Sequence, residues 1–156
     1  MDTKKILIIS DTHKNISNAV DIIEVHKPDY VLHLGDHIDD ADDLKHIFPR
    51  TEVIGVCGNC DWATSLMSPT ERMLDIGGVK VFMCHGHTYS VKSGIEHFVS
   101  VARGKGAGIA LYGHTHIPLL DNRGDIIVMN PGTVNTYGLI EIKNGKADAR
   151  MCAFGE

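Results

Sequence analysis

Three short apolar runs, separated by two segments of helical pattern, occupy residues 1–56. This alternation predicts a β-α-β-α-β unit, whose strands are parallel because each crossover helix returns the chain to the same edge of the sheet. The expected strands are Lys4–Ser10, Tyr30–Leu34 and Glu52–Val56, and the expected helices are Ile16–His26 and Asp40–Phe48, the second capped by Asp39 or Asp40. This part of the chain therefore indicates an α/β fold.

The rest of the chain is richer in strands than in helices. Gly77-Gly78 separates two apolar stretches and is typical of a tight hairpin. An amphipathic helix is expected over Val91–Arg103, where apolar residues recur at helical spacing. Further strands are expected at Met73–Ile76, Val79–Cys84, Ile109–Tyr112, Leu119–Asp121, Ile126–Met129, Leu139–Ile142 and Ala147–Cys152. The pattern predicts one domain over 1–156, with antiparallel strands added to mixed sheets.

Composition and charge exclude several classes of protein. Of the 156 residues, 43% are hydrophobic and 22% charged, which is typical of globular proteins and excludes disorder and coiled coil. The net charge of −5 lacks the basic excess of a nucleic-acid-binding surface. The sequence has neither an apolar run of about 18 residues, as a membrane span needs, nor a signal peptide. We therefore expect a cytoplasmic protein without a membrane partner, whose four cysteines are thiols.

Polar residues follow five of the predicted strands at the point where each strand ends. The candidate metal donors among them are Asp11 and His13; Asp36; Asn59; His85; and His114 and His116, and the same segments also carry Asp61 and His87. Because ligands of open α/β sheets bind outside the carboxyl ends of the strands, these side chains are expected to gather at one edge. Carboxylate, imidazole and amide donors together suit first-row transition metals, and seven donors suit two ions that share a carboxylate and a water.

The same segments carry five short motifs: Asp-x-His at Asp11, Gly-Asp at Asp36, Gly-Asn-x-Asp at Asn59, His-Gly-His at His85 and Gly-His-x-His at His114. In this order and at strand ends, they resemble the motifs of the calcineurin-like metallophosphoesterase superfamily. The short chain and the Gly-Asn-Cys-Asp form are similar to its small prokaryotic phosphodiesterase branch. The resemblance extends from Ile6 to about Thr133 and implies a four-layer α/β/β/α sandwich with two mixed sheets in a single domain.

The resemblance also implies which residues serve the site. Asp11, His13 and His116 would bind one metal ion, Asn59, His85 and His114 a second, and Asp36 would bridge the two. The expected metal is manganese, with nickel, iron or zinc as alternatives. The expected catalytic residues are Asn59, Cys60 and Asp61, and the residues expected beside the ligands or the substrate are His87, His33 and Asn130. His33 is either such a support or an ordinary core residue.

A site of this kind predicts hydrolysis of phosphodiester bonds in a small phosphoester substrate. Two divalent ions bring four positive charges, of which Asp11 and Asp36 offset two, so that a phosphate anion is attracted. The ions lower the pKa of a bridging water from about 16 toward about 7, and the resulting hydroxide attacks phosphorus in line.

One position departs from the family pattern. Many members carry histidine where this chain has Cys60, and the resemblance implies that this histidine protonates the leaving oxygen. Because a thiol is a poorer proton donor, we expect activity on activated diesters and weak activity on monoesters, with His87 as a substitute donor.

The sequence leaves the natural substrate open. Specificity is expected from the loops Trp62–Arg72 and Tyr89–Lys92, in which no pattern indicates a base or a sugar. Asn130-Pro131-Gly132-Thr133 resembles a turn beside the family's site, but the basic segment that often follows it is missing here. The oligomeric state is open as well, because Trp62, Leu66 and Met67 suit either a cap or the interface of a homo-oligomer.

Alternatives to a two-metal phosphodiesterase stay open. Cys57 and Cys60 have the spacing of a thioredoxin-like redox pair and of a regulatory disulfide. Together with Cys84 and His85 they form a candidate zinc site. Some relatives with this fold lack metal ligands and serve as non-catalytic scaffolds for protein binding. A phosphomonoesterase is the remaining alternative.

Overall fold

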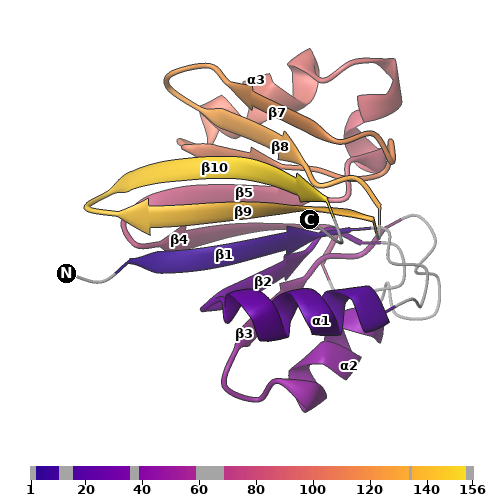
Figure 1. Ribbon diagram of the computed structural model, residues 1–156. Coiled ribbons are helices and arrows are strands. Elements are labelled where there is room, and N and C mark those ends of the chain that lie inside the picture. The colour runs from indigo at the N-terminus through magenta and orange to yellow at the C-terminus, as the bar shows by residue number, and fades with distance from the viewer. Residues whose placement is uncertain (1–2, 11–15, 36–38, 59–68, 134, 154–156) are drawn as a thin grey trace.

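The computed structural model describes residues 3–10, 16–35, 39–58, 69–133 and 135–153. Its strands form two five-stranded sheets (Figure 1). The first sheet has the order β10-β9-β1-β2-β3, built from β1 (Lys4–Ile9), β2 (Tyr30–His33), β3 (Glu52–Gly55), β9 (Thr136–Lys143) and β10 (Lys146–Ala153). In this sheet β1, β2 and β3 are parallel, and β9 runs antiparallel to both β1 and β10. The parallel unit predicted for residues 1–56 is therefore confirmed.

The second sheet has the order β4-β5-β6-β8-β7. It is built from β4 (Glu71–Ile76), β5 (Val79–Cys84), β6 (Ile109–Leu111), β7 (Leu119–Asn122) and β8 (Ile127–Asn130). Here β5, β6 and β8 are parallel, whereas β4 and β7 are antiparallel edge strands. The expectation that strands late in the chain join as antiparallel additions holds for β7, β9 and β10 but not for β8, which pairs in parallel with β6.

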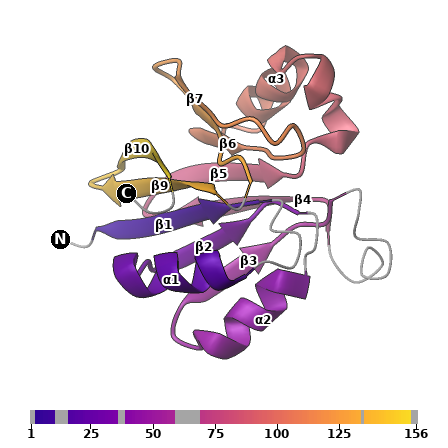
Figure 2. The same cartoon turned by 45° about the vertical axis from the view of Figure 1, so that its right-hand side comes forward.

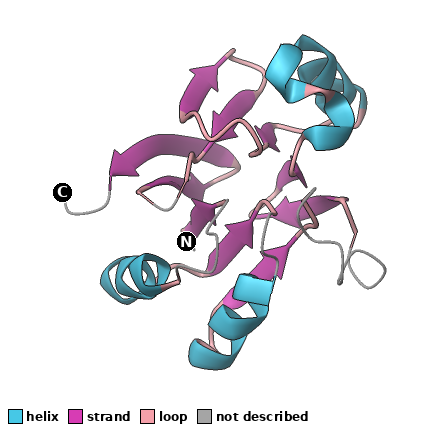
Figure 3. Cartoon of the chain, turned by 90° about the vertical axis from the view of Figure 1, so that its right-hand side faces the viewer, coloured by secondary structure: helices cyan, strands magenta, loops and turns pink. Residues whose placement is uncertain are grey.

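Helices cover the outer face of each sheet, and the two sheets face each other (Figures 2 and 3). The inner core joins residues of both sheets, among them Ile6 and Leu32 from the first and Met83 and Leu111 from the second. On the first sheet lie α1 (Ser17–His26) and α2 (Asp39–Ile47), and on the second lies α3 (Glu96–Gly104). The four-layer sandwich and the single α/β domain are thus confirmed.

Local chemistry explains the main differences from expectation. The helix expected over Val91–Arg103 is divided into a 3-10 turn, η2 (Val91–Ser93), and α3. Gly94 separates them with φ 138°, a backbone conformation that no α-helix contains and that glycine adopts without steric cost. A first 3-10 turn, η1 (His87–Tyr89), precedes η2. Because α2 begins at Asp39, Asp39 and Asp40 lie inside the helix rather than at its cap.

Turn chemistry elsewhere follows the sequence pattern. Gly77 and Gly78 both have positive φ, 59° and 87°, as a tight hairpin between β4 and β5 requires. Within the described residues, no helix has the length and apolar character needed to span a bilayer.

Candidate functional site

The carboxyl ends of β2 and β5, which belong to different sheets, meet at one point. The His85 ring, directly after β5, lies 2.8 Å through Nδ1 from the carbonyl oxygen of Leu34, directly after β2. Both residues are fully buried. The ends of the two sheets are therefore joined at the edge where the sequence predicts a site.

The contact with Leu34 determines the tautomer of His85. A carbonyl oxygen can only accept a hydrogen bond, so the proton is on Nδ1 of His85 and the lone pair is on Nε2. In metalloproteins, a histidine ligand is commonly oriented by a hydrogen bond from its other ring nitrogen to a carbonyl group. His85 thus has the support that a metal ligand needs.

His114 completes a pair with His85. Nδ1 of His114 lies 3.2 Å from Nε2 of His85, and the ring centroids are 5.0 Å apart. Two imidazole nitrogens that share a metal ion at about 2.1 Å lie about 3.0–3.4 Å apart for coordination angles between perpendicular and tetrahedral. The observed separation falls in this range, so the pair fits a shared ion.

A glycine brings these elements together. Gly35 has φ 102°, and a Cβ atom at this position would lie 2.8 Å from the backbone nitrogen of Gly58 and 3.0 Å from Nδ1 of His85. Any side chain here would push apart the segments that follow β2, β3 and β5. Gly35 also donates its backbone N–H to Nδ1 of His33, which is fully buried. His33 is therefore a core residue that supports the turn before Asp36.

Asn130 holds the loop that carries His114. Its side-chain nitrogen donates to the Gly113 carbonyl oxygen at 3.2 Å and to Oγ1 of Thr115 at 2.8 Å. Its side-chain oxygen accepts from the backbone N–H of Gly132 at 2.9 Å. Because the buried amide uses its polar atoms on the protein itself, Asn130 is placed to position the loop rather than to contact substrate.

The remaining predicted histidines lie beside the pair. The His87 ring centroid is 5.5 Å from that of His85 and 6.2 Å from that of His114. Nδ1 of His87 is buried and has no hydrogen-bond partner among the residues that the structure describes. His116 is exposed and adopts φ 63°, and His114 adopts φ 70°. Left-handed backbone in non-glycine residues costs about 1–3 kcal/mol, and such strain clusters at functional sites.

Six predicted site residues lie outside the described residues: Asp11, His13, Asp36, Asn59, Cys60 and Asp61. Within the described ranges, no group of three or more His, Cys, Asp or Glu side chains is arranged to hold a metal ion. The zinc alternative therefore has no support from Cys57, Cys84 and His85. Burial, followed by the nearby Glu71 carboxylate, raises the pKa of the Cys84 thiol, which keeps it neutral.

Two contributions to the site were not predicted from the sequence. The Leu34 carbonyl, which orients His85, carries no signal because every residue has such a group. Thr115 lies between two predicted ligands, at the variable position of the Gly-His-x-His motif, so the motif assigns it no role. Its hydroxyl oxygen accepts hydrogen bonds from the Asn130 side chain and from the backbone N–H of Ile117. The only indication of this role in the sequence is that a threonine side chain can form hydrogen bonds to nearby backbone.

Comparison with known proteins concerns the family of the chain as a whole. A family model described as the calcineurin-like phosphoesterase superfamily domain matches residues 5–145. The chain is 28% identical over 157 residues to the probable metallophosphoesterase YsnB of Bacillus subtilis strain 168, covering 94% of this chain and 89% of that protein. It is 30% identical over 105 residues to the phosphodiesterase YfcE of Escherichia coli K12, covering 58% and 53%.

Solved structures share the fold. A predicted phosphoesterase from Streptococcus pneumoniae TIGR4 superimposes with a TM-score of 0.81 at 24% identity, covering 98% of this chain and 91% of that one. An archaeal phosphodiesterase gives 0.70 at 23% identity, covering 95% and 99%. Vacuolar Protein Sorting 29 from Cryptosporidium parvum gives 0.73 at 19% identity, covering 99% of each chain. At these identities the likeness concerns the fold.

Proposed function

The chain belongs to the calcineurin-like phosphoesterase superfamily, and on this premise we propose that it hydrolyses phosphodiester bonds at a centre of two divalent metal ions. Manganese is the proposed metal because the donors mix carboxylate, imidazole and amide groups. The single observation that carries the proposal is the pairing of His85 and His114 at 3.2 Å, with His85 oriented by the Leu34 carbonyl.

The proposed ligands follow strands of both sheets, and each ion would take ligands from both. His85 and His114 would hold one ion together with Asn59. His116 would hold the other together with Asp11 and His13, and Asp36 would bridge them. When bound, the ions would supply positive charge to the phosphate oxygens and lower the pKa of a water molecule to about 7.

The chain's own residues have distinct tasks in this proposal. Asn59, Cys60 and Asp61 would form the catalytic turn, as in the family pattern. Asn130 would keep the 113–115 loop in register by its contacts to Gly113 and Thr115. Buried hydrogen bonds of this kind restrict a ligand to one orientation, and their loss typically costs about 10–100-fold in metal affinity or activity.

The proposed preference for activated esters follows from the proton donor at the leaving oxygen. Cys60 replaces the family's histidine, and a thiol transfers a proton poorly to an alkoxide. His87 lies beside the His85–His114 pair and would donate a proton from a ring nitrogen in its place. Activated diesters need this proton least, so they are the proposed best substrates. The diester activities in the names of YfcE and the archaeal relative support this choice.

A substrate panel tests the proposal. Protein loaded with manganese would be assayed on bis(4-nitrophenyl) phosphate, 4-nitrophenyl phosphate and cyclic nucleotides. The two nitrophenyl substrates release the same leaving group, so their comparison tests the choice of diester over monoester separately from leaving-group protonation. We expect kcat/KM for the diester to exceed that for the monoester by at least about tenfold. A monoester preference would indicate a phosphomonoesterase. No turnover with manganese, nickel, iron or zinc would favour the non-catalytic scaffold.

A further inference from the structure

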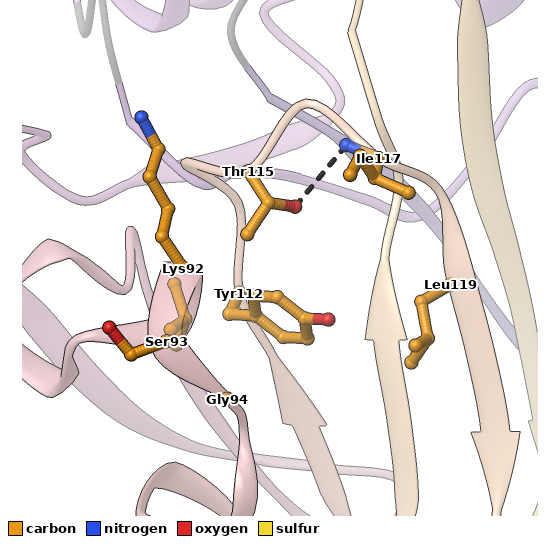
Figure 4. A pocket seen from close by; sticks show the side chains of 8 residues that line it. Lys92, Ser93, Gly94, Tyr112, Thr115, Ile117 and Leu119 are labelled. Carbon is orange, nitrogen blue, oxygen red and sulfur yellow. Dashed lines mark hydrogen bonds between the residues drawn. The ribbon is translucent and has the colours of Figure 1, made fainter.

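A pocket of about 640 Å³ lies next to the loop that carries His114 and His116. One wall comes from η2, at Val91 and Lys92, and the other from residues that follow β6, at Tyr112, Thr115 and Ile117 (Figure 4). Pockets that bind small molecules are typically about 300–1,000 Å³. The residues of both walls lie in the connections that follow the strands β5 and β6. These two strands end at the His85–His114 pair.

The polar end of the pocket offers a hydrogen-bond donor. Oγ1 of Thr115 accepts from the side-chain nitrogen of Asn130 at 2.8 Å and from the backbone nitrogen of Ile117 at 3.2 Å. These two bonds occupy both acceptor sites of a hydroxyl, so its proton is left to donate. Within the described residues that proton has no acceptor. Thr115 is adjacent in sequence to both His114 and His116.

A cation lies at the same end. The Lys92 side chain extends from η2 along the side of the pocket on which Thr115 lies (Figure 4). Lys92 is exposed and forms no salt bridge with any residue that the structure describes. The full charge of its ammonium group is therefore available to an anion at the histidine loop.

The other end is apolar. The Tyr112 ring and Leu119 lie away from the Lys92 ammonium group in Figure 4, and Val91 also lines the pocket. Tyr112 is almost fully buried, so its ring forms a fixed surface. Ile117 is 68% exposed at the rim, so a ligand in the pocket can cover its apolar surface. The pocket therefore combines a donor and a cation with apolar side chains, of which Ile117 lies beside Thr115 and Tyr112 and Leu119 lie farther from it (Figure 4).

We propose that this pocket binds the organic group of the phosphodiester, with the phosphate directed to Thr115 and Lys92 and an aromatic or other apolar ester group against Tyr112, Ile117 and Leu119. The proposal rests on the proposed function, because it places the phosphate at the same histidine loop. It adds a substrate class, since a chain with this pocket prefers aryl or other apolar esters to small hydrophilic ones. Ile117, Leu119 and Lys92 become its specificity-determining residues.

Gly86, Ser90 and Gly94 determine the position of η2, which forms one wall of the pocket. A Cβ atom on Gly86 would lie 2.7 Å from Cγ2 of Val91, so only glycine lets the η2 wall approach the end of β5 this closely. Ser90 and Gly94 have φ of 54° and 138°, which confine η2 to one short turn. A continuous helix over 91–103, as the periodicity predicts, would present a different wall.

Binding of non-hydrolysable phosphonates tests the inference without turnover. Isothermal titration calorimetry on the manganese-loaded protein would compare phenylphosphonate with methylphosphonate. We expect the phenyl compound to bind at least about tenfold more tightly because its ring buries apolar surface. Ile117→Ser should bring this ratio to about threefold or less. Leu120→Ser is the matched control, because Leu120 is also partly exposed, at 39%, but does not line the pocket.

Substitution of Lys92 tests separately whether its charge contributes to binding of the phosphonate anion. Lys92→Gln should weaken both phosphonates by a similar factor, about threefold, and leave their ratio unchanged because the charge acts on the shared anion. Lys143→Gln, an exposed change on β9, is the control.

The outcomes separate the inference from the proposed function. Equal affinity for the two compounds, or a ratio that survives Ile117→Ser, would overturn the pocket assignment while leaving the esterase proposal intact. Failure of both phosphonates to bind in the presence of manganese would overturn the two together.

Discussion

The two sheets each contain three adjacent parallel strands but differ in their antiparallel strands and in what covers their outer faces. In the first sheet only β9 runs against the others, because β10 pairs antiparallel with β9 and so has the direction of β1, whereas in the second sheet both edge strands, β4 and β7, run against the middle three. The strands β2 and β5 end at the same edge. The first sheet is covered by two regular helices, α1 and α2 (Figure 1). The second is covered by α3 and the turns η1 and η2. A pocket of about 570 Å³ also lies beside α1 on the first sheet, but the pocket beside the histidine loop lies on the second sheet, against η2.

Backbone strain follows the same division. Five non-glycine residues among those described have positive φ: Lys27, Ser90, His114, His116 and Asn144. Lys27 caps α1 and Asn144 forms the turn between β9 and β10, both of which are common places for this conformation. The other three lie in connections of the second sheet near the site. The second sheet thus carries the strained non-glycine connections near the candidate site.

The first sheet's contribution is tested by its bridging carboxylate, for which we expect the largest effect. Asp36→Ala should remove both metal ions and measurable diesterase activity, because the proposed bridge serves both ions. Metal content by mass spectrometry and the melting temperature would show loss of metal with the fold retained. Asp75→Ala, an exposed change on β4, is the control. A variant that kept more than about a tenth of the wild-type rate would show that the bridge is misassigned.

His85→Ala tests the junction between the sheets. We expect a fall in kcat/KM of at least about 100-fold from loss of a ligand. We also expect a loss of about 1–3 kcal/mol in the free energy of unfolding, because the buried Leu34 carbonyl loses its donor.

His97→Ala is the control for that change. His97 is exposed on α3 and its ring contacts Tyr89, away from the pair, so rate and metal content should stay at wild-type values. If His97→Ala removed metal, the assignment of histidines would be wrong.

Asn130→Asp tests the second sheet's loop alone. The carboxylate can still accept from Gly132 but can no longer donate to Gly113 and Thr115. We expect about a tenfold loss in manganese affinity and kcat/KM. Asn122→Asp is a close match, because the Asn122 side-chain oxygen accepts from Gly124 in the same two-residue pattern. Equal manganese affinity in the two variants would argue against a positioning role for Asn130.

The smallest expected effect is the limited chemical modification of the cysteine thiols. Cys57 and Cys84 are fully buried, Cys152 is partly exposed, and these three cysteines form no disulfide. In a Cys60→Ser background, Ellman's reagent should therefore modify one thiol readily and two only after unfolding. The raised pKa of Cys84 acts in the same direction, because the thiolate is the reacting form. Rapid reaction of more than one thiol would contradict the burial of the pair.

The sequence predicted the strands well because burial leaves a strong local signal. β1, β2 and β3 are continuous apolar runs, and the Gly77-Gly78 hairpin follows from turn chemistry. The helix predicted over Val91–Arg103 is longer than the observed α3 because the apolar period continues through η2. Gly94, whose φ is not helical, separates η2 from α3. A hydrophobic period reports which residues are buried, and both η2 and α3 bury apolar side chains.

Among the described residues, the sequence indicated the His85–His114 pair but not the groups that support it. His85 and His114 follow strands and fall in recognisable motifs, and the structure brings them together. The Leu34 carbonyl and the pocket beside Thr115 depend on contacts between segments far apart in the chain, which no local pattern encodes.

Metal stoichiometry tests the central claim most directly. Protein stripped with a chelator would be titrated with manganese by calorimetry, with diesterase activity measured at each point. The account predicts two equivalents bound, with activity rising to its maximum as the second site fills. His114→Ala should bind only one equivalent and stay inactive. Binding of no manganese, or full activity with one equivalent or none, would contradict a two-metal centre at the shared edge of the sheets.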